Sequence, residues 1–385
     1  MKLFKTSILV TFVTFLLLVL LETIFYFGRI YLNKPNVGFL INFNKSVTTR
    51  IKDNCQRMKT HPILNYIHFH NSKCKVFGSS KYDEYFIWYK KNEISKNKKK
   101  LLILTSGGST TDGFYQHISN GYTWPYYLQK ICEKEFNCQV INGGTGGYST
   151  TQELLKLITY NHLVPKIDYV ISLNGINDIR TSRRTSGKNF KLHPYLTKVQ
   201  YEMLQEQIWV NQHKENIKIF PNILSFVNYT KFHNKNLNKF DLFDKKKNNK
   251  KEKDKLIMDL NNYSIVWQKN INLMYGVSNS INSIFFSFLQ PTMGLDYVNF
   301  NKNLSTKDVE MYENYKNTKL NLETNAFYKI LRNKCQQIEF CIDISHTAAP
   351  GENLFKDPRH HNSKGNLVIA KEIFDKIKKN EELKN

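Results

Sequence analysis

The chain contains a serine at a strand end and, far from it in sequence, the histidine and aspartate that could activate it. Residues 101–111 read Leu-Leu-Ile-Leu-Thr-Ser-Gly-Gly-Ser-Thr-Thr, so an apolar run ends in a Gly-Gly turn that presents Ser109. Asp357 and His360 occur together in a segment Asp-Pro-Arg-His near the C-terminus. An imidazole that accepts the serine proton, oriented by a carboxylate, makes the hydroxyl a nucleophile, whatever the order of the residues in the chain. His361 is a competing candidate for the base, although the Asp-x-x-His spacing favours His360.

Two further blocks could stabilise the negative oxygen that such an attack creates. Residues 142–149 read Asn-Gly-Gly-Thr-Gly-Gly-Tyr-Ser, where the backbone N–H of Gly147 would suit an oxyanion hole. Residues 173–178 read Leu-Asn-Gly-Ile-Asn-Asp, where the side-chain amide of Asn177 can donate a hydrogen bond. Taken singly, the glycine-rich block is equally compatible with a flexible loop, and the Asn-Asp pair is better explained as an ordinary turn. The Gly-Gly-Ser-Thr turn also fits a helix cap, whereas a phosphate-binding loop is disfavoured because Gly-x4-Gly-Lys is absent.

These blocks follow strands of a predicted parallel sheet. Five short apolar, β-rich runs alternate with helical patterns. The predicted strands are residues 101–105, 139–142, 169–173, 283–290 and 340–344, and the predicted helices include residues 123–135, 151–161 and 321–334. Such alternation is typical of a parallel sheet covered by helices on both faces, in which ligands bind beyond the carboxyl ends of the strands.

In this order, the four blocks resemble the SGNH hydrolase (GDSL-like esterase) superfamily over about residues 100–377. The resemblance implies a Ser109–His360–Asp357 triad and an oxyanion hole built from Ser109, Gly147 and Asn177. It also implies a flavodoxin-like three-layer α/β/α sandwich with a five-stranded parallel sheet, and neither a metal nor an organic cofactor. One departure is that Gly108 stands where the family has the aspartate of its Gly-Asp-Ser motif.

The N-terminus predicts a membrane anchor. Residues 7–28 are almost entirely apolar and follow Lys2 and Lys5, and about 20 such residues span a bilayer as a helix. Glu22 lies towards the outer end of this run, and the aromatic residues after it suit a membrane interface. We therefore expect an uncleaved signal anchor over residues 1–32, a membrane-proximal segment over 33–100, and a hydrolase-like domain over 101–378 with an insertion at about 180–282.

The cysteines predict an oxidising compartment. Two pairs share the same spacing and each brackets a helix-to-strand junction, and a third pair lies upstream. The expected disulfides join Cys132 to Cys138, Cys335 to Cys341 and Cys55 to Cys74. Zinc is the alternative, but the spacing is not Cys-x2-Cys and no histidine pair lies alongside. Disulfides place the body of the protein outside the cytoplasm.

The chain is strongly basic, with 56 Lys and Arg against 32 Asp and Glu and a formal net charge of +24. Such a charge suits an anionic surface such as phospholipid headgroups or an acidic glycan. Nucleic acid is disfavoured because no recognised binding motif accompanies the charge, and a Lys/Asn-rich composition alone would also explain it. The lysine-rich residues 231–255 predict a solvated loop, or else an electrostatic arm. His61, His68 and His70 lack a carboxylate at ligand spacing, so we interpret them as ordinary packed or exposed histidines rather than a metal site.

Together these features predict a membrane-anchored serine ester hydrolase that acts on an acylated envelope glycan or a lipid-linked substrate. Three alternatives stay open. The same acyl-enzyme could transfer its acyl group to a cell-surface polysaccharide, which would make the protein an O-acyltransferase. The fold could also serve as a non-catalytic glycan-binding module. Lastly, the glycine-rich blocks could be turns of a purely structural anchored protein.

Overall fold

The computed structural model describes residues 2–31, 58–61, 63–68, 76, 78–91, 97–113, 122–179, 250–293, 295, 307–347 and 352–384. The chain divides into two compact units. One comprises Met1–Asn54 and Glu202–Asn249, and the other comprises Cys55–Tyr201 and Lys250–Asn385. Part of the segment predicted to be membrane-proximal therefore belongs to the same unit as the sheet.

The first unit contributes helix α1 (Lys2–Tyr31). A helix is present where the sequence predicted a signal anchor. Within the part of the chain that the structure describes, however, no helix combines the length and apolar character needed to cross a membrane. The predicted transmembrane span is therefore not supported.

A seven-stranded sheet forms the centre of the second unit, with the order β3-β4-β6-β5-β7-β8-β9. Its strands are β3 (Ser79–Tyr82), β4 (Ile87–Tyr89), β5 (Lys100–Gly107), β6 (Asn137–Asn142), β7 (Tyr169–Asn174), β8 (Ile284–Leu289) and β9 (Cys341–Asp343). The five strands from β5 to β9 are parallel and correspond to the five predicted runs. Their order is that of flavodoxin-like sheets.

The expectation of a sheet with only five strands is wrong, because β3 and β4 extend one edge. β4 pairs antiparallel with β6, and β3 pairs antiparallel with β4. Both strands come from the segment predicted to precede the hydrolase-like domain. At four and three residues, they are too short for an alternating apolar pattern to announce them in the sequence.

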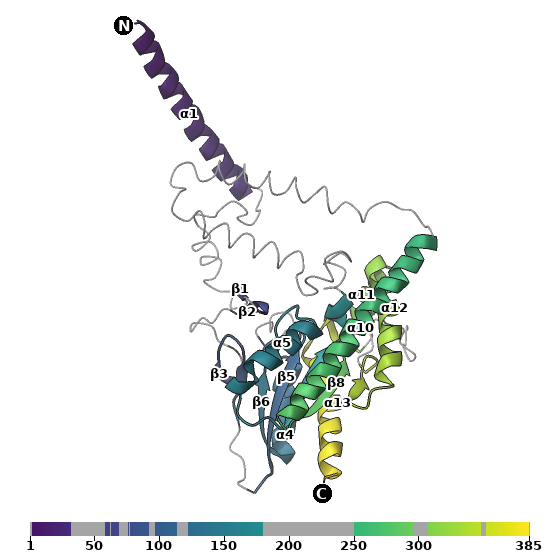
Figure 1. Cartoon of the computed structure of the whole chain (residues 1–385). Helices are drawn as coiled ribbons and strands as arrows, with labels where there is room; N and C mark the ends of the chain where they lie inside the picture. Colours follow the sequence, from purple (N-terminus) through teal and green to yellow (C-terminus); the bar gives the residue numbers. More distant parts are fainter. Residues whose placement is uncertain are drawn as a thin grey trace. The chain divides into compact units, whose positions relative to one another are not determined.

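Helices cover both faces of this sheet because its strands are apolar on both sides. In β5, Leu101 and Ile103 pack into one core, whereas Leu104 packs into the other. The first core contains residues of α4 (Trp124–Glu135) and α13 (Ser363–Glu382). The second contains residues of α5 (Thr150–Tyr160), α10 (Lys250–Ser280) and α12 (Lys319–Cys335), and α10 runs diagonally across the sheet in Figure 1. The three layers and the three predicted helices are confirmed.

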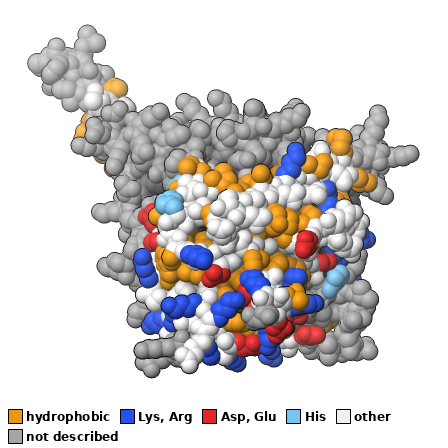
Figure 2. Space-filling view, turned by 60° about the horizontal axis from the view of Figure 1, so that its bottom comes forward, with side chains coloured by type: hydrophobic (Ala, Val, Ile, Leu, Met, Phe, Trp, Pro, Cys, Tyr) orange, Lys and Arg blue, Asp and Glu red, His pale blue; other side chains and the backbone are white. Residues whose placement is uncertain are grey.

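The C-terminal part of the predicted insertion contributes to the hydrophobic core. Its residues 250–280 form α10, whose Trp267 and Ile271 are fully buried. The remainder, residues 180–249, lies outside the described residues and includes most of the lysine-rich stretch. Among the described residues on the face shown in Figure 2, Lys and Arg side chains lie dispersed among Asp and Glu side chains and apolar areas, not in one continuous basic patch.

Smaller elements complete the second unit. Strands β1 (Met58–His61) and β2 (Asn65–His68) form an antiparallel hairpin. Strands β10 (Phe355–Asp357) and β11 (His360–His361) form another, just before α13. The 3₁₀ helix η2 (Asn161–Leu163) and helix α11 (Lys307–Tyr315) are short connecting elements.

Two of the three expected disulfides are present. Cys132 in α4 bonds to Cys138 in β6, and Cys335 at the end of α12 bonds to Cys341 at the start of β9. Each therefore closes a helix-to-strand junction, as the repeated spacing predicted. Cys55 and Cys74 lie outside the described residues.

Candidate active site

Ser109 lies on a sharp turn at the carboxyl end of β5. The N–H groups of Thr111 and Asp112 both donate to the Gly108 carbonyl, at 3.0 Å each. The turn starts at Gly107, whose φ of +151° is one that residues with side chains rarely adopt. A Cβ there would also lie 2.1 Å from the Thr111 hydroxyl oxygen and 2.8 Å from the Leu173 carbonyl oxygen. The sequence therefore needs glycine at this position to turn the chain at the strand end.

Ser109, His360 and Asp357 form one hydrogen-bonded chain. The Ser109 Oγ lies 2.7 Å from His360 Nε2, although the two residues are 251 positions apart in sequence. The other ring nitrogen, Nδ1, lies 2.9 Å and 2.8 Å from the two carboxylate oxygens of Asp357. The Asp357 carboxylate also accepts the backbone N–H groups of Arg359 and His360, at 2.9 Å and 3.1 Å. The hairpin β10–β11 thus holds acid and base in register.

The surroundings of Asp357 favour its ionised form. Burial by itself would raise the pKa of this carboxyl, but the hydrogen bond and charge of His360, aided by the two backbone N–H groups, leave the pKa below its usual value. An ionised carboxylate can only accept hydrogen bonds, so it favours the imidazole tautomer that carries its proton on Nδ1. In that tautomer, Nε2 is free to accept the Ser109 proton.

His361, the competing candidate for the base, occupies a different environment. Its ring is buried and packs against the Phe355 ring at a centroid distance of 4.7 Å. Burial, and then the neighbouring His360, lower the pKa of His361 to about 3. The structure therefore brings His360 to Ser109 and leaves His361 as a neutral core residue.

The two blocks proposed for the oxyanion hole converge on the same turn. The Asn177 amide nitrogen donates to the Tyr148 carbonyl at 2.9 Å, and a Cβ on Gly108 would lie 2.1 Å from that nitrogen. Because an amide carries two donor hydrogens, Asn177 retains one for another acceptor. Gly147 precedes Tyr148 and has a φ of +82°, in the left-handed region. Asn177 therefore contacts the residue before Ser109 and the residue after Gly147.

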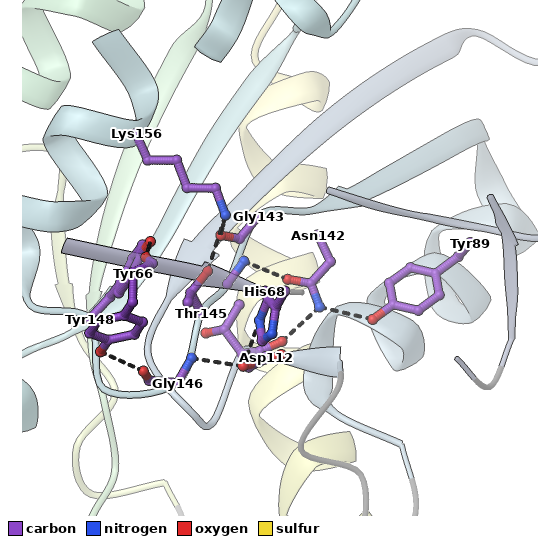
Figure 3. A network of polar contacts seen from close by, with 12 residues as sticks. Tyr66, His68, Tyr89, Asp112, Asn142, Gly143, Thr145, Gly146, Tyr148 and Lys156 are labelled. Carbon is purple, nitrogen blue, oxygen red and sulfur yellow. Dashed lines mark hydrogen bonds and ion pairs between the residues drawn. The ribbon is translucent and has the colours of Figure 1, made fainter. Parts of the chain in front are cut away.

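The glycine-rich loop after β6 is held by hydrogen bonds to β5 and to the turn that carries Ser109 (Figure 3). The N–H groups of Gly143 and Thr145 donate to the carbonyls of Thr105 and Gly107, at 2.8 Å and 3.0 Å. The N–H of Gly146 donates to the carboxylate of Asp112 at 2.7 Å. Asp112 is fully buried and was not singled out from the sequence. The sequence shows Asp112 three positions after Ser109, but this spacing does not indicate that its side chain contacts the glycine-rich loop.

His61 and His68, which we interpreted from the sequence as ordinary histidines, have different partners. His68, on β2, lies 2.9 Å from the Asp112 carboxylate, and both side chains are almost completely buried. His61 instead contacts the Tyr160 hydroxyl through Nε2 at 2.7 Å. His70 lies outside the described residues. Over the described ranges, no group of three or more His, Cys, Asp or Glu side chains is arranged to hold a metal ion.

Three more ionisable side chains are buried behind the loops. Lys156 on α5 donates to the Gly143 carbonyl at 2.7 Å, and burial lowers the pKa of this lysine to about 7. Burial raises the pKa of Glu153, which accepts the Ser172 hydroxyl at 2.6 Å, to about 8. Burial likewise raises the pKa of Asp178 to about 6. These groups bond the loops and strands around them and lie outside the hydrogen-bonded chain of Ser109.

Comparisons with known proteins complete the description. No family model matches the chain, and no curated protein matches it. Among solved structures, it is similar to an acetyl xylan esterase, with 11% identity, 72% of this chain and 100% of the other covered, and a TM-score of 0.37. For the acetylxylan esterase Axe2 of Geobacillus stearothermophilus, the values are 12% identity, 74% and 96% coverage, and a TM-score of 0.35. For an α/β hydrolase enzyme from the metagenome of Lake Arreo, Spain, they are 12%, 71% and 93%, and 0.33.

Proposed function

We propose that this protein is a serine ester hydrolase with Ser109 as nucleophile, His360 as base and Asp357 as the residue that orients the base. One observation carries the proposal, namely the continuous hydrogen-bonded chain from Ser109 Oγ through the His360 ring to the Asp357 carboxylate. The 2.7 Å between Ser109 Oγ and His360 Nε2 lies within the range over which a base accepts a proton, and the 2.8 Å between His360 Nδ1 and Asp357 is a hydrogen bond that orients that base.

In the proposed reaction, Ser109 Oγ attacks the ester carbonyl carbon while His360 Nε2 accepts the hydroxyl proton. The tetrahedral intermediate collapses when His360 gives this proton to the departing alcohol oxygen, which leaves an acyl group on Ser109. Water then attacks the acyl-enzyme while His360 accepts one of its protons. His360 gives this proton to Ser109 Oγ as the bond between Oγ and the acyl carbon breaks, which releases the carboxylic acid and restores the serine hydroxyl. Asp357 stabilises the imidazolium that exists between these transfers.

The negative oxygen of the intermediate would be held by the N–H groups of Ser109 and Gly147 and by the amide of Asn177. Support for this comes from the contact of Asn177 with both Gly108 and the Tyr148 carbonyl. Removal of one such donor typically lowers kcat about 100- to 1,000-fold.

The compartment and substrate belong to the same proposal. Two disulfides at buried helix-to-strand junctions support an oxidising, extracytoplasmic compartment. There, the formal charge of +24 favours an anionic surface. We infer that the substrate is an acyl ester carried by a cell-envelope glycan or lipid.

The proposal can be tested with the purified full-length chain. We expect a fluorophosphonate probe to label wild type and p-nitrophenyl acetate to be hydrolysed. Ser109→Ala should abolish labelling and lower kcat by about 10,000-fold or more, because the oxyanion site and binding alone retain little catalysis. Ser280→Ala is the matched control, since the Ser280 hydroxyl is exposed and only bonds the Val277 carbonyl within its own helix.

A folded Ser109→Ala protein that hydrolyses the ester at the wild-type rate would disprove the assignment. A wild-type assay with an acylated oligosaccharide as acyl donor and an unacylated oligosaccharide as acyl acceptor then separates hydrolysis from transfer. If acyl-oligosaccharide forms faster than free acid, the same acyl-enzyme belongs to an O-acyltransferase. If the probe fails to label wild type at all, a non-catalytic binding role is favoured.

A further inference from the structure

We propose that the β1–β2 hairpin is part of the catalytic apparatus, with Tyr66 as a positioning residue that orients the Gly147 N–H for the oxyanion. This inference rests on the proposed function. The hairpin lies upstream of the segment in which the sequence locates every site residue. Its contacts with the glycine-rich loop are what connect it to the reaction.

The main contact is a hydrogen bond from the Tyr66 hydroxyl to the Gly146 carbonyl, at 2.7 Å and buried. This carbonyl belongs to the same peptide unit as the N–H of Gly147. A trans peptide is planar, and its C=O and N–H point in opposite directions. A group that fixes the direction of the Gly146 carbonyl therefore also fixes the direction of the Gly147 N–H. The bond also polarises the peptide and so makes that N–H a stronger donor.

The other side of Gly146 is held from the same strand. Its N–H donates to Asp112 at 2.7 Å, and Asp112 is paired with His68 at 2.9 Å. Tyr66 and His68 are two positions apart on β2, so they project from the same face of the strand. Gly146 is thus fixed at its carbonyl directly by the hairpin and at its N–H through Asp112 (Figure 3).

The fit around Gly147 shows how closely the hairpin approaches. A Cβ on Gly147 would lie 2.8 Å from the Tyr66 hydroxyl oxygen. In return, the Tyr148 hydroxyl donates to the Tyr66 carbonyl at 2.5 Å, and the two rings meet edge to face at 5.3 Å. Gln152 donates to the Leu64 carbonyl at 3.2 Å. These contacts lock hairpin and loop together, so the peptide between Gly146 and Gly147 has little freedom to rotate.

A role in positioning can be separated from a role in folding by single-atom changes. Tyr66→Phe removes one hydroxyl and leaves the ring in place. Tyr160→Phe is the matched control because the Tyr160 hydroxyl also bonds the hairpin, at His61, but not Gly146. Asp112→Asn keeps an oxygen that can accept the Gly146 N–H, whereas Asp112→Ala removes it.

The experiment measures kcat and KM for p-nitrophenyl acetate per site titrated with the fluorophosphonate, so that unfolded protein does not count. We expect Tyr66→Phe to lower kcat about tenfold with KM within about twofold, less than the loss of a whole oxyanion donor. Inhibition by a boronic acid, whose tetrahedral serine adduct mimics the intermediate, should weaken by the same factor. Tyr160→Phe should leave both quantities within about twofold. Asp112→Asn should retain more of kcat than Asp112→Ala.

Equal kcat per titrated site for Tyr66→Phe and Tyr160→Phe, with labelling intact, would overturn this inference and leave the hydrolase proposal standing. Two other results for Tyr66→Phe would overturn it as well. One is a loss of titratable sites with kcat per site unchanged, and the other is a change in KM alone. A wild-type protein that is not labelled, or Ser109→Ala with full activity, would instead remove the proposed function, and this inference with it.

Discussion

The amide nitrogen of Asn177 occupies the space that a side chain on residue 108 would need. A Cβ built on Gly108 would lie 2.1 Å from that nitrogen, well inside van der Waals contact. The same nitrogen donates to the Tyr148 carbonyl at 2.9 Å, which limits how far it can retreat. Glycine before Ser109 therefore does more than permit a turn, because it lets the Asn177 amide approach the backbone beside Ser109.

We predict that Gly108→Ala lowers kcat for p-nitrophenyl acetate about 100-fold. The new methyl group displaces the Asn177 amide, and the loss of one oxyanion donor has an effect of this size. The measurement is steady-state kinetics normalised to titrated sites. Gly276→Ala is the control, since nothing lies within 4 Å of a Cβ at that position in α10.

The control carries its own expectation. Replacing a glycine inside a helix with alanine stabilises the helix by about 0.5–1 kcal/mol, so Gly276→Ala should raise the free energy of unfolding slightly and leave kcat unchanged. If Gly108→Ala were as active as Gly276→Ala, the contact between residue 108 and Asn177 would not matter for catalysis.

Asp357→Asn should lower kcat about 10,000-fold, which is the size of the loss when the triad aspartate of a serine protease is replaced by asparagine. An asparagine amide donates to Nδ1 and so favours the tautomer with the imidazole proton on Nε2. A protonated Nε2 can no longer accept the proton of Ser109. Asp343→Asn is the matched control, because Asp343 also accepts the backbone N–H two residues later, at 2.9 Å, without facing His360. Activity retained in Asp357→Asn would show that the carboxylate does not orient the base.

Glu153 should make stability depend on pH. Burial raises the pKa of this carboxyl from 4.5 to about 8, so the folded state holds a proton that the unfolded state has lost between these values. The contribution of Glu153 is therefore fully present below pH 4.5 and is lost as the pH rises towards 8, by at most about 1.4 kcal/mol per pH unit.

The test is urea denaturation of wild type and Glu153→Gln at pH 5, 6 and 7. Glutamine resembles the protonated carboxyl, which accepts the Ser172 hydroxyl, so the variant should become progressively more stable relative to wild type as the pH rises. Parallel stability curves over this range would show that Glu153 does not hold an extra proton in the folded state.

Loss of the disulfide between Cys335 and Cys341 should lower the free energy of unfolding by about 2 kcal/mol. The bond closes a short loop, with a sequence separation of 6, and restricts the unfolded chain accordingly. The double variant Cys335→Ala/Cys341→Ala is compared with wild type by urea denaturation without reductant. Equal stability of the two proteins would contradict the prediction.

Much of the central layer was predictable because the signals are local. Each of the strands from β5 to β9 is an apolar run bounded by turn residues, and parallel strands place their carboxyl ends along one edge. The positions of Ser109, Gly147 and Asn177 near that edge follow from this rule alone. Equal cysteine spacing at two helix-to-strand junctions likewise indicated the two disulfides before any coordinates.

Other features depend on contacts that no local pattern encodes. The edge strands β3 and β4 are too short to show a period. Helix α10 was assigned to an insertion because it lies in the long interval between the third and fourth predicted strands. The apolar N-terminal run predicted a membrane span that the described residues do not support. His68 appeared to be an ordinary histidine, and Asp112 was overlooked.

The sequence by itself determined the chemistry available to this protein, since residue type decides which groups can donate, accept or attack. Its alternation of strands and helices also indicated that the carboxyl ends of the parallel strands share one edge. Only the tertiary structure decided which groups touch. The 2.7 Å between Ser109 and His360, and the buried link from His68 through Asp112 to Gly146, arise where distant segments pack together. Packing selects one partner among many chemically equivalent ones, and that selection is a property of the whole core rather than of any segment.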